Sequence, residues 1–364
     1  MFASQLARVS SGSSPSSRSR SSGIIANRCT VISFASRGAS GRAPLADPQR
    51  APLTITRHVT ADEHESDSHR LVLDEAVTAR VQGIPPLRQR NRYVIDRKSA
   101  VSLDDARSYA FAPANKVDRS GAYRLAFGFD VAEGRPIRLY SNDTDSTYQA
   151  VPDAREPTVT VRGSRALVYN GRQQPHTLSP VYLAGLEQAI GLPVTTTLKE
   201  LGRGLERAGV DLSAVVAALP RADQERVKQL QGKAIPLIYE ESLESRAAIE
   251  PKTGTLANLF HERVTVTVRP NPKALAPLVA ILHRNEAIAA VRSSQPKLQA
   301  ASTQAQPVFA LDYHQTPASV NDTGDDISTA STQISVVKLW LPLILVGLGL
   351  GLVALGARRG RRTA

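Results

Sequence analysis

The sequence predicts an α+β fold: a β-rich antiparallel domain with a helical insertion, followed by one C-terminal transmembrane helix. Two patterns in the 364 residues support this prediction. Apolar and polar residues alternate along much of the stretch 51–314, which is typical of half-buried antiparallel strands. The nineteen residues 339–357 contain no charge, and a helix of that length matches the hydrocarbon core of a bilayer.

Positive charge is concentrated at the two ends of the chain. Residues 1–50 are rich in Ser and Arg and carry a net +6, and residues 358–364 carry +4, which leaves +2 of the total +12 for the rest. We expect no nucleic-acid partner, because a nearly neutral middle offers no basic face to a phosphate backbone. The leader 1–50 lacks apolar periodicity, so we predict that it is disordered.

The first half of the domain has the texture of successive strands. Val, Leu, Ile, Tyr and Phe alternate there with polar residues, which predicts strands with one face in the core. The predicted strands cover residues 53–60, 70–81, 92–101, 122–131, 137–141, 157–163 and 166–170.

A helical pattern replaces the strands at about 179–231. Ser179 followed by Pro180 is typical of a helix start, and Gly209 and Pro220 end further short helical patterns. We therefore predict a helical insertion, and we expect its apolar faces to cover one face of the sheet.

Strand texture returns at 234–270 and predicts a long hairpin. Pro251 pre-sets its own φ angle for the turn, and Gly254 can take the left-handed conformation that follows. The remaining expected elements are helices at 272–283 and 284–293, a short strand at 307–313, and a polar stalk at 315–337 that holds the domain away from the bilayer.

The predicted membrane helix, 338–357, carries the residues expected of an anchor. A Trp and a Lys lie where an interfacial aromatic and a snorkelling cation belong, and a GxxxG spacing allows a helix-mediated homo-oligomer. The arginines of the tail 358–364 favour a cytoplasmic C-terminus, and hence an extracytoplasmic domain. The candidate anchor residues are Lys338, Trp340, Gly347, Gly351, Arg358, Arg359, Arg361 and Arg362.

Motifs for catalysis or cofactor binding are missing from the sequence. Cys29 is the only cysteine, which excludes an intrachain disulfide and a cysteine-based zinc site. The histidines form no HExxH, and there is no Gly-x-Ser-x-Gly elbow. The segments 62–69 and 142–145 are rich in acids, but their spacings fit no metal pattern and indicate turns. We expect no enzyme activity, no cofactor and no metal.

Five segments, in order along the chain, resemble the actinobacterial porin PorA-like family. They are VIDRKSA at 94–100, VDRSGAY at 117–123, FGFD at 127–130, LYSNDTDSTY at 139–148 and the hairpin stretch 235–266. The resemblance implies a β-rich outside domain held between an N-terminal and a C-terminal membrane helix, with a function that is not defined. The Ser- and Arg-rich leader stands where that family has its first helix.

We therefore expect a single-pass protein of the cell membrane that acts without catalysis in the envelope. Besides membrane lipid, its extracytoplasmic domain is expected to bind an envelope lipid, glycan or protein. Two alternatives stay open: a porin or channel component, and an anchored hydrolase of envelope polymers. A pore built from strands needs an unbroken apolar outer band, whereas charges such as Asp74, Glu75, Glu240 and Glu241 fall on both strand faces.

Overall fold

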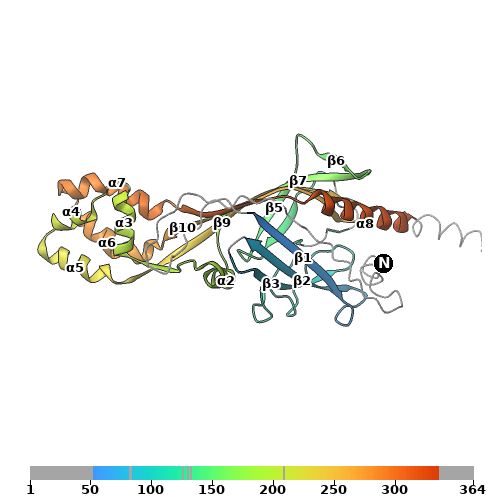
Figure 1. The fold of residues 1–364 in the computed structure, drawn as a ribbon, viewed down its shortest axis with the longest axis horizontal. Helices are drawn as coiled ribbons and strands as arrows, with labels where there is room; N and C mark the ends of the chain where they lie inside the picture. The colour runs from blue at the N-terminus through green and yellow to red at the C-terminus, as the bar shows by residue number, and fades with distance from the viewer. Residues whose placement is uncertain are drawn as a thin grey trace, which may run out of the picture.

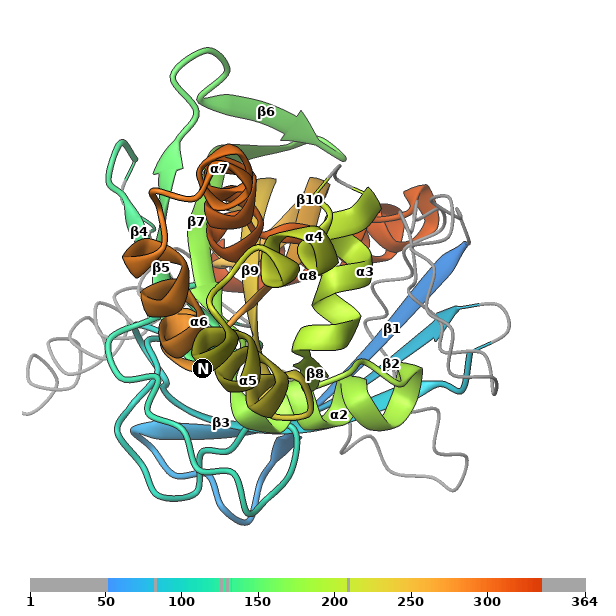
Figure 2. The same ribbon diagram turned by 90° about the vertical axis from the view of Figure 1, so that its left-hand side faces the viewer.

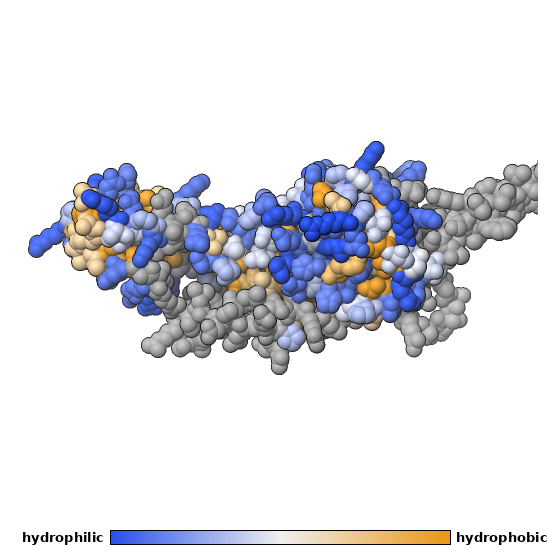
Figure 3. Space-filling view, turned by 90° about the horizontal axis from the view of Figure 1, so that it is seen from above, coloured by the Kyte–Doolittle hydropathy of each residue, from blue (hydrophilic) through white to orange (hydrophobic). Residues whose placement is uncertain are grey.

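The structure is a computed structural model that describes residues 52–335, except 82–83, 125–126, 129–130, 132 and 208–209. It consists of two antiparallel sheets with helices at both ends of an elongated molecule (Figure 1). The predicted β-rich antiparallel fold with helices is confirmed. Hydrophilic residues dominate the face seen in Figure 3, where hydrophobic residues form separate patches.

The smaller sheet has three strands, β1 (Leu53–Asp62), β2 (Arg70–Val81) and β3 (Leu87–Asp96). They follow one another as antiparallel hairpins in the order β1-β2-β3. Alternation along β2 and β3 turns one set of side chains toward the core. This set contains Leu71, Leu73, Tyr93 and Ile95.

The larger sheet has eight strands and is built around a long hairpin, β9 and β10. The order is β11-β10-β9-β7-β5-β4, with β6 paired to β7 and β8 paired to β9. In Figure 1 the hairpin runs from the helical end of the molecule into its middle. The strands are β4 (Ile137–Ser141), β5 (Ser146–Pro152), β6 (Thr158–Val161), β7 (Ser164–Thr177), β8 (Thr195–Thr197), β9 (Ala234–Glu250), β10 (Thr255–Pro270) and β11 (Gln306–Tyr313).

Helix α2 (Pro180–Ile190) begins where Ser179 and Pro180 predict. The Ser179 side chain accepts a hydrogen bond from the Tyr182 backbone N–H, and Gly191 closes the helix in the left-handed conformation at φ 68°, as helix caps commonly do. Tyr182 and Leu186 face Tyr239 and other core residues of the large sheet. Helix α2 therefore covers part of that sheet.

The other helices of the insertion do not cover the sheet, which corrects our expectation. Helices α3, α4 and α5 pack with α6 and α7 at the end of the β9–β10 hairpin that is opposite its turn (Figure 2). They share a separate core with the apolar side of α6, which offers Leu275, Leu278 and Ile281. These helices are α3 (Leu198–Arg207), α4 (Leu212–Ala217), α5 (Arg221–Gln231), α6 (Pro272–Arg284) and α7 (Ala289–Thr303).

The predicted polar stalk is instead a helix over most of its length, α8 (Pro317–Ser335). It contacts β10 and β7, and Ile327 is only 1% exposed. Val320 and Ile327 are seven residues apart, so they share one face of a helix. That face packs against the small core beneath β6, and this contact explains why the segment lies on the domain.

Two strand predictions also differ from the structure. The segment predicted at 122–131 forms no strand among its described residues, where Tyr123 makes one isolated bridge to Leu139. Strand β5 was not predicted, because its sequence STYQAVP has few apolar residues to alternate. Within the segment 122–131, the backbone N–H of Phe127 donates a hydrogen bond to the carbonyl of Gly254 in the β9–β10 turn. This bond takes the place of sheet pairing.

The predicted membrane span cannot be compared with the structure. Within the described residues, no helix is both long and apolar enough to cross a membrane. The stretch 338–357 and the tail 358–364 lie outside the described residues. The same holds for every candidate anchor residue, namely Lys338, Trp340, Gly347, Gly351, Arg358, Arg359, Arg361 and Arg362.

Candidate functional site

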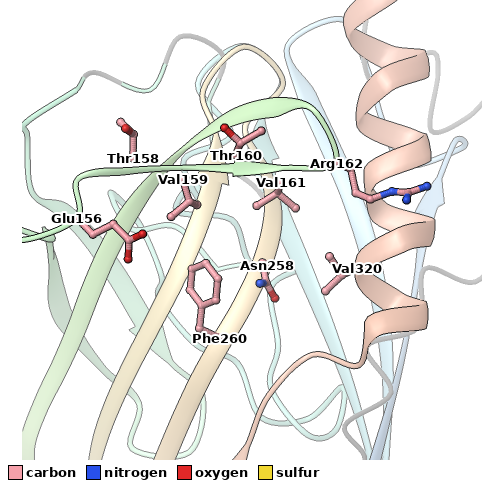
Figure 4. Close-up of a pocket in the computed structure, with 9 residues that line it drawn as sticks. All are labelled: Glu156, Thr158, Val159, Thr160, Val161, Arg162, Asn258, Phe260 and Val320. Atoms are coloured by element: carbon pink, nitrogen blue, oxygen red, sulfur yellow. The ribbon is translucent and has the colours of Figure 1, made fainter.

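A hollow of about 640 Å³ lies where β6 passes over β10 beside α8 (Figure 4). Val159 and Val161 point into it from β6, Phe260 faces them from β10, and Val320 borders it from α8. Its volume is within the range of roughly 300–1,000 Å³ that is usual for small-molecule sites. The hollow is therefore large enough for a ligand, and apolar side chains and the Asn258 amide share its middle.

The sequence of β6 explains why this strand lines the hollow with two apolar side chains. Thr-Val-Thr-Val alternates with the period of a strand, so both valines lie on one face and both threonines on the other. The side chains of Thr158 and Thr160 accordingly lie on the face of β6 opposite the valines (Figure 4), although both residues border the hollow. The strand then turns back into β7 through Arg162 and Gly163, which both have positive φ angles, 50° and 81°, as a two-residue hairpin turn requires.

An ion-pair network borders the hollow beside Phe260. The Arg246 guanidinium lies 4.7 Å from the Phe260 ring centroid and pairs with the carboxylates of Asp153 and Glu156. Backbone N–H groups of Arg155 and Glu156 donate to Asp153 and, with Arg246, hold the pKa of this carboxyl well below its usual range. Asp153 therefore stays ionised and fixes Arg246 against the ring.

Helix α8 approaches the β6–β7 turn closely at Gly324. A Cβ atom built on Gly324 would lie 2.6 Å from Cγ of Arg162, so a larger residue there would push the helix from the turn. The Arg162 guanidinium reaches Asp325 at 3.4 Å, but both side chains are largely exposed, so this pair adds little stability. Glycine thus allows α8 to form one side of the hollow.

A second polar feature lies between the two sheets. Glu75 of β2 is 2% exposed, and its carboxylate pairs with Nε of Arg57 at 2.7 Å. It also accepts hydrogen bonds from Asn91 and Tyr93, both at 2.7 Å. Burial opposes the charge, but Arg57, Arg124 and these donors lower the pKa of Glu75. The pKa of Glu75 is therefore lowered even though the carboxylate is buried.

Two other carboxyl groups in this region have a raised pKa, in contrast to Glu75. Burial raises the pKa of Asp143 to about 6, and Glu262 and Glu75 add to the rise while Arg124 opposes it. Glu241 of β9 has an exposure of 0%. Its burial, with the charges of Asp143 and Glu262, raises its pKa well above the usual range, although Arg124 and the Ser141 hydroxyl act against this.

The acid-rich segments of the sequence form turns in the structure. Residues 62–69 connect β1 and β2, and the Asp67 carboxylate accepts from the backbone N–H groups of His69 and Arg70. Residues 142–145 connect β4 and β5. Among the residues that the structure describes, no group of three or more His, Cys, Asp or Glu side chains could hold a metal ion.

The hollow and the buried acids were not predicted as sites. Val159 and Val161 were visible as strand alternation, but the partner strand and α8 are distant in the sequence. Glu241 was visible as a charge on a strand, without any sign of which face it occupies. Histidines outside the acid-rich turn 62–69 are spread over β1, β7, β10, α6 and the loop before α8, and they are His58, His176, His261, His283 and His314.

Comparison with known proteins agrees with the resemblance seen in the sequence. No curated protein matches the chain. The family model described as Porin PorA matches residues 1–358, which is nearly the whole chain and includes both sheets, the helical cluster and α8. The protein therefore belongs to the Porin PorA family, and this membership indicates a protein of the cell envelope.

Proposed function

We propose that this protein is a membrane-anchored, non-catalytic domain that binds the acyl chain of an envelope lipid in the hollow beneath β6. The observation that carries the proposal is the set of apolar side chains in the hollow, Val159, Val161, Phe260 and Val320, which share its lining with Asn258 and with polar residues at its edges. An acyl chain has no polar groups to satisfy, and burying it there removes apolar surface from water on both sides.

The position of charges around the hollow also fits a chain-like ligand. Glu156 lies near one end and Arg162 near the other, with the apolar residues between them (Figure 4). Glu156 is already paired with Arg246, whereas Arg162 makes an exposed contact to Asp325. An acyl chain can lie along β6 and leave its polar end in water at the rim.

The place of α8 in the chain supports a membrane lipid as the source of this ligand. Helix α8 borders the hollow and ends at Ser335, shortly before the uncharged stretch 339–357 of the sequence. A membrane span there, followed by the arginines of the tail, favours an extracytoplasmic domain with a cytoplasmic C-terminus. In that topology the hollow is close to the outer surface of the membrane.

The burial of Glu241 removes one candidate acid from the hydrolase alternative. Glu241 has no exposed surface, so an envelope polymer cannot reach its carboxyl group in the folded domain. A general acid has to lie within hydrogen-bonding reach of its substrate.

Photo-crosslinking tests the proposed lipid site. The full chain is placed in nanodiscs that contain a phospholipid with a photoreactive acyl chain, and crosslinked peptides are mapped by mass spectrometry. We expect crosslinks on β6, on β10 around Phe260 and on α8 around Val320. Val159→Glu should reduce them at least about tenfold, because a carboxylate in the apolar hollow costs more than 1.4 kcal/mol.

Thr160→Glu is the matched control for this test. It makes the same change on the same strand, but the exposed Thr160 side chain lies on the face of β6 opposite Val159 and Val161, so crosslinking should stay as in the unchanged protein. Equal crosslinking in the Val159→Glu and Thr160→Glu proteins would exclude the hollow as the lipid site.

Cysteine labelling tests the proposed topology independently. In a Cys29→Ser background, Thr160→Cys should react with a membrane-impermeant maleimide on intact cells, because its side chain is exposed. A residue 160 that reacts only after lysis would contradict an extracytoplasmic domain.

A further inference from the structure

The amide of Asn258 is a polar group in the middle of the hollow beneath β6. Asn258 of β10 lies between Phe260 of the same strand and Val320 of α8 (Figure 4), and the two valines of β6 line the hollow with them. The charged side chains of the hollow, Glu156 and Arg162, lie at its two ends. Apolar side chains therefore flank the amide on both sides.

Two register shifts in the pairing of β10 with β9 place this amide in the hollow. The first lies immediately before Asn258 and leaves Ala257 as an extra residue, and the second follows Leu259. Asn258 consequently pairs with Ala248, and paired residues of neighbouring strands lie on the same face of a sheet. Ala248 belongs to the small core beneath β6. Such irregularities re-aim side chains and are common beside active sites.

The Asn258 amide has no partner of its own in the protein. Among the residues that the structure describes, none forms a hydrogen bond with this side chain, although an amide offers two donors and one acceptor oxygen. Asn258 is half-buried, so water reaches the amide while the hollow is open. A ligand that fills the hollow removes this water.

A plain acyl chain is a poor replacement for the water at Asn258. It has no polar group, so it leaves the covered amide without hydrogen bonds, which is costly for a buried polar group. The carbonyl of an ester only accepts and leaves the amide oxygen unpaired. A hydroxyl both donates and accepts, so it satisfies the oxygen and one N–H of the amide together.

A charged headgroup is also a poor partner for the amide. At Asn258 its charge would lie among apolar side chains, with Phe260 on one side and Val320 on the other, where an unpaired charge is unfavourable. The nearby cation is Arg246, which is already paired with two carboxylates. The partner of the amide is therefore neutral and lies within the chain of the ligand.

We propose that Asn258 selects an acyl chain that carries a hydroxyl group along its length, with hydrocarbon on both sides of that group. This inference rests on the proposed lipid site and deepens it, because it names the chemistry of the chain. The apolar side chains of the hollow receive the hydrocarbon. The Asn258 amide donates to the hydroxyl and accepts from it.

Competition in the crosslinking experiment tests this selection on the full chain in nanodiscs. Stearate, a mid-chain hydroxystearate and a mid-chain methylstearate are added, and the concentration of each that halves crosslinking of the photoreactive phospholipid is measured. The methyl group is similar in size to the hydroxyl but forms no hydrogen bonds. In the unchanged protein, hydroxystearate should compete at about a tenfold lower concentration than the other two.

Asn258→Leu should abolish the preference for hydroxystearate. Leucine keeps the branched shape of the side chain but has no polar atoms, so the three fatty acids should compete alike and stearate should compete better than before. Asn321→Leu is the matched control. Asn321 follows Val320 on α8 and is exposed, so this variant should keep the preference.

The outcomes separate failure of the selection from failure of the lipid site. If crosslinks map to the hollow but hydroxystearate and stearate compete equally in the unchanged protein, the selection is overturned and the lipid site stands. This comparison needs no variant, so it holds whatever Asn258→Leu does to folding. A preference that survives in Asn258→Leu also overturns the proposal. Absence of crosslinks from the hollow removes the lipid site, and the selection with it.

Discussion

The guanidinium of Arg119 lies over the ring of Tyr93, with its carbon 4.3 Å from the ring centroid. The Tyr140 ring lies on it as well, at 5.3 Å. Tyr93 belongs to the small sheet and Tyr140 to the large one. Arg119 is 1% exposed, and its donors reach the side chain of Asn142 and the backbone carbonyls of Arg92 and Tyr109. One buried cation therefore connects the two sheets.

Arg119→Met should lower the free energy of unfolding by about 3 kcal/mol. The change removes the two cation–π contacts, each worth about 1–2 kcal/mol when desolvated, and leaves buried acceptors unpaired. Arg119→Lys should be milder, because it keeps the charge but lacks the planar set of donors. Denaturant unfolding measures both. Arg155→Met, at an exposed arginine, should change the value by no more than about 0.5 kcal/mol.

Gly254→Ala should destabilise the protein by about 3 kcal/mol, because two costs add. Gly254 has a φ of 65°, where an L-residue pays about 1–2 kcal/mol. A Cβ atom there would also collide with the carbonyl oxygen of Phe127. Gly163→Ala separates the two costs, since its φ is 81° but no neighbouring atom lies within 4 Å of the added Cβ. Equal losses of thermal stability in the two variants would contradict the collision.

Local chemistry explains which elements the sequence could predict. Ser179 and Pro180 define the start of α2. The turn between β9 and β10 is likewise set by Pro251 and Gly254. Each of these signals depends on the φ angle or hydrogen bonds of the residues that carry it, so no knowledge of the tertiary structure was needed.

Contacts between distant segments explain what the sequence could not predict. The polar composition of 317–335 indicated a stalk. In the structure, Ile327 shares a small core with Ala248 and Ala257, and this burial holds α8 on the sheet. The hollow likewise requires Val159, Phe260 and Val320 to meet. Whether Glu241 faces water or the core depends on distant segments such as α2, whose Tyr182 lies near it, and strand periodicity does not contain this information.

Asp105 should make the protein sensitive to acid. Its carboxylate accepts from Nε and Nη2 of Arg107 at 2.9 and 2.7 Å, and Arg107 also bonds to the carbonyl of Glu65 in the β1–β2 turn. The hydrogen bonds from Arg107 lower the pKa of Asp105 from 3.8 to about 2, although burial opposes the shift. Because the pKa of Asp105 is lower in the folded protein than in the unfolded chain, its contact with Arg107 stabilises the fold fully above pH 3.8. This stabilisation is lost as pH falls through about 2.

Asp105→Asn should therefore lower the free energy of unfolding by about 1–2 kcal/mol at pH 7, and this difference should shrink toward zero near pH 2. Denaturant titrations at pH 7, 4 and 3 measure it. Asp104→Asn is the control, because Asp104 is the exposed neighbour in the same loop and its change should leave stability within about 0.5 kcal/mol. A difference that grows on acidification would show that Asp105 stabilises the loop by something other than its ionised contact with Arg107.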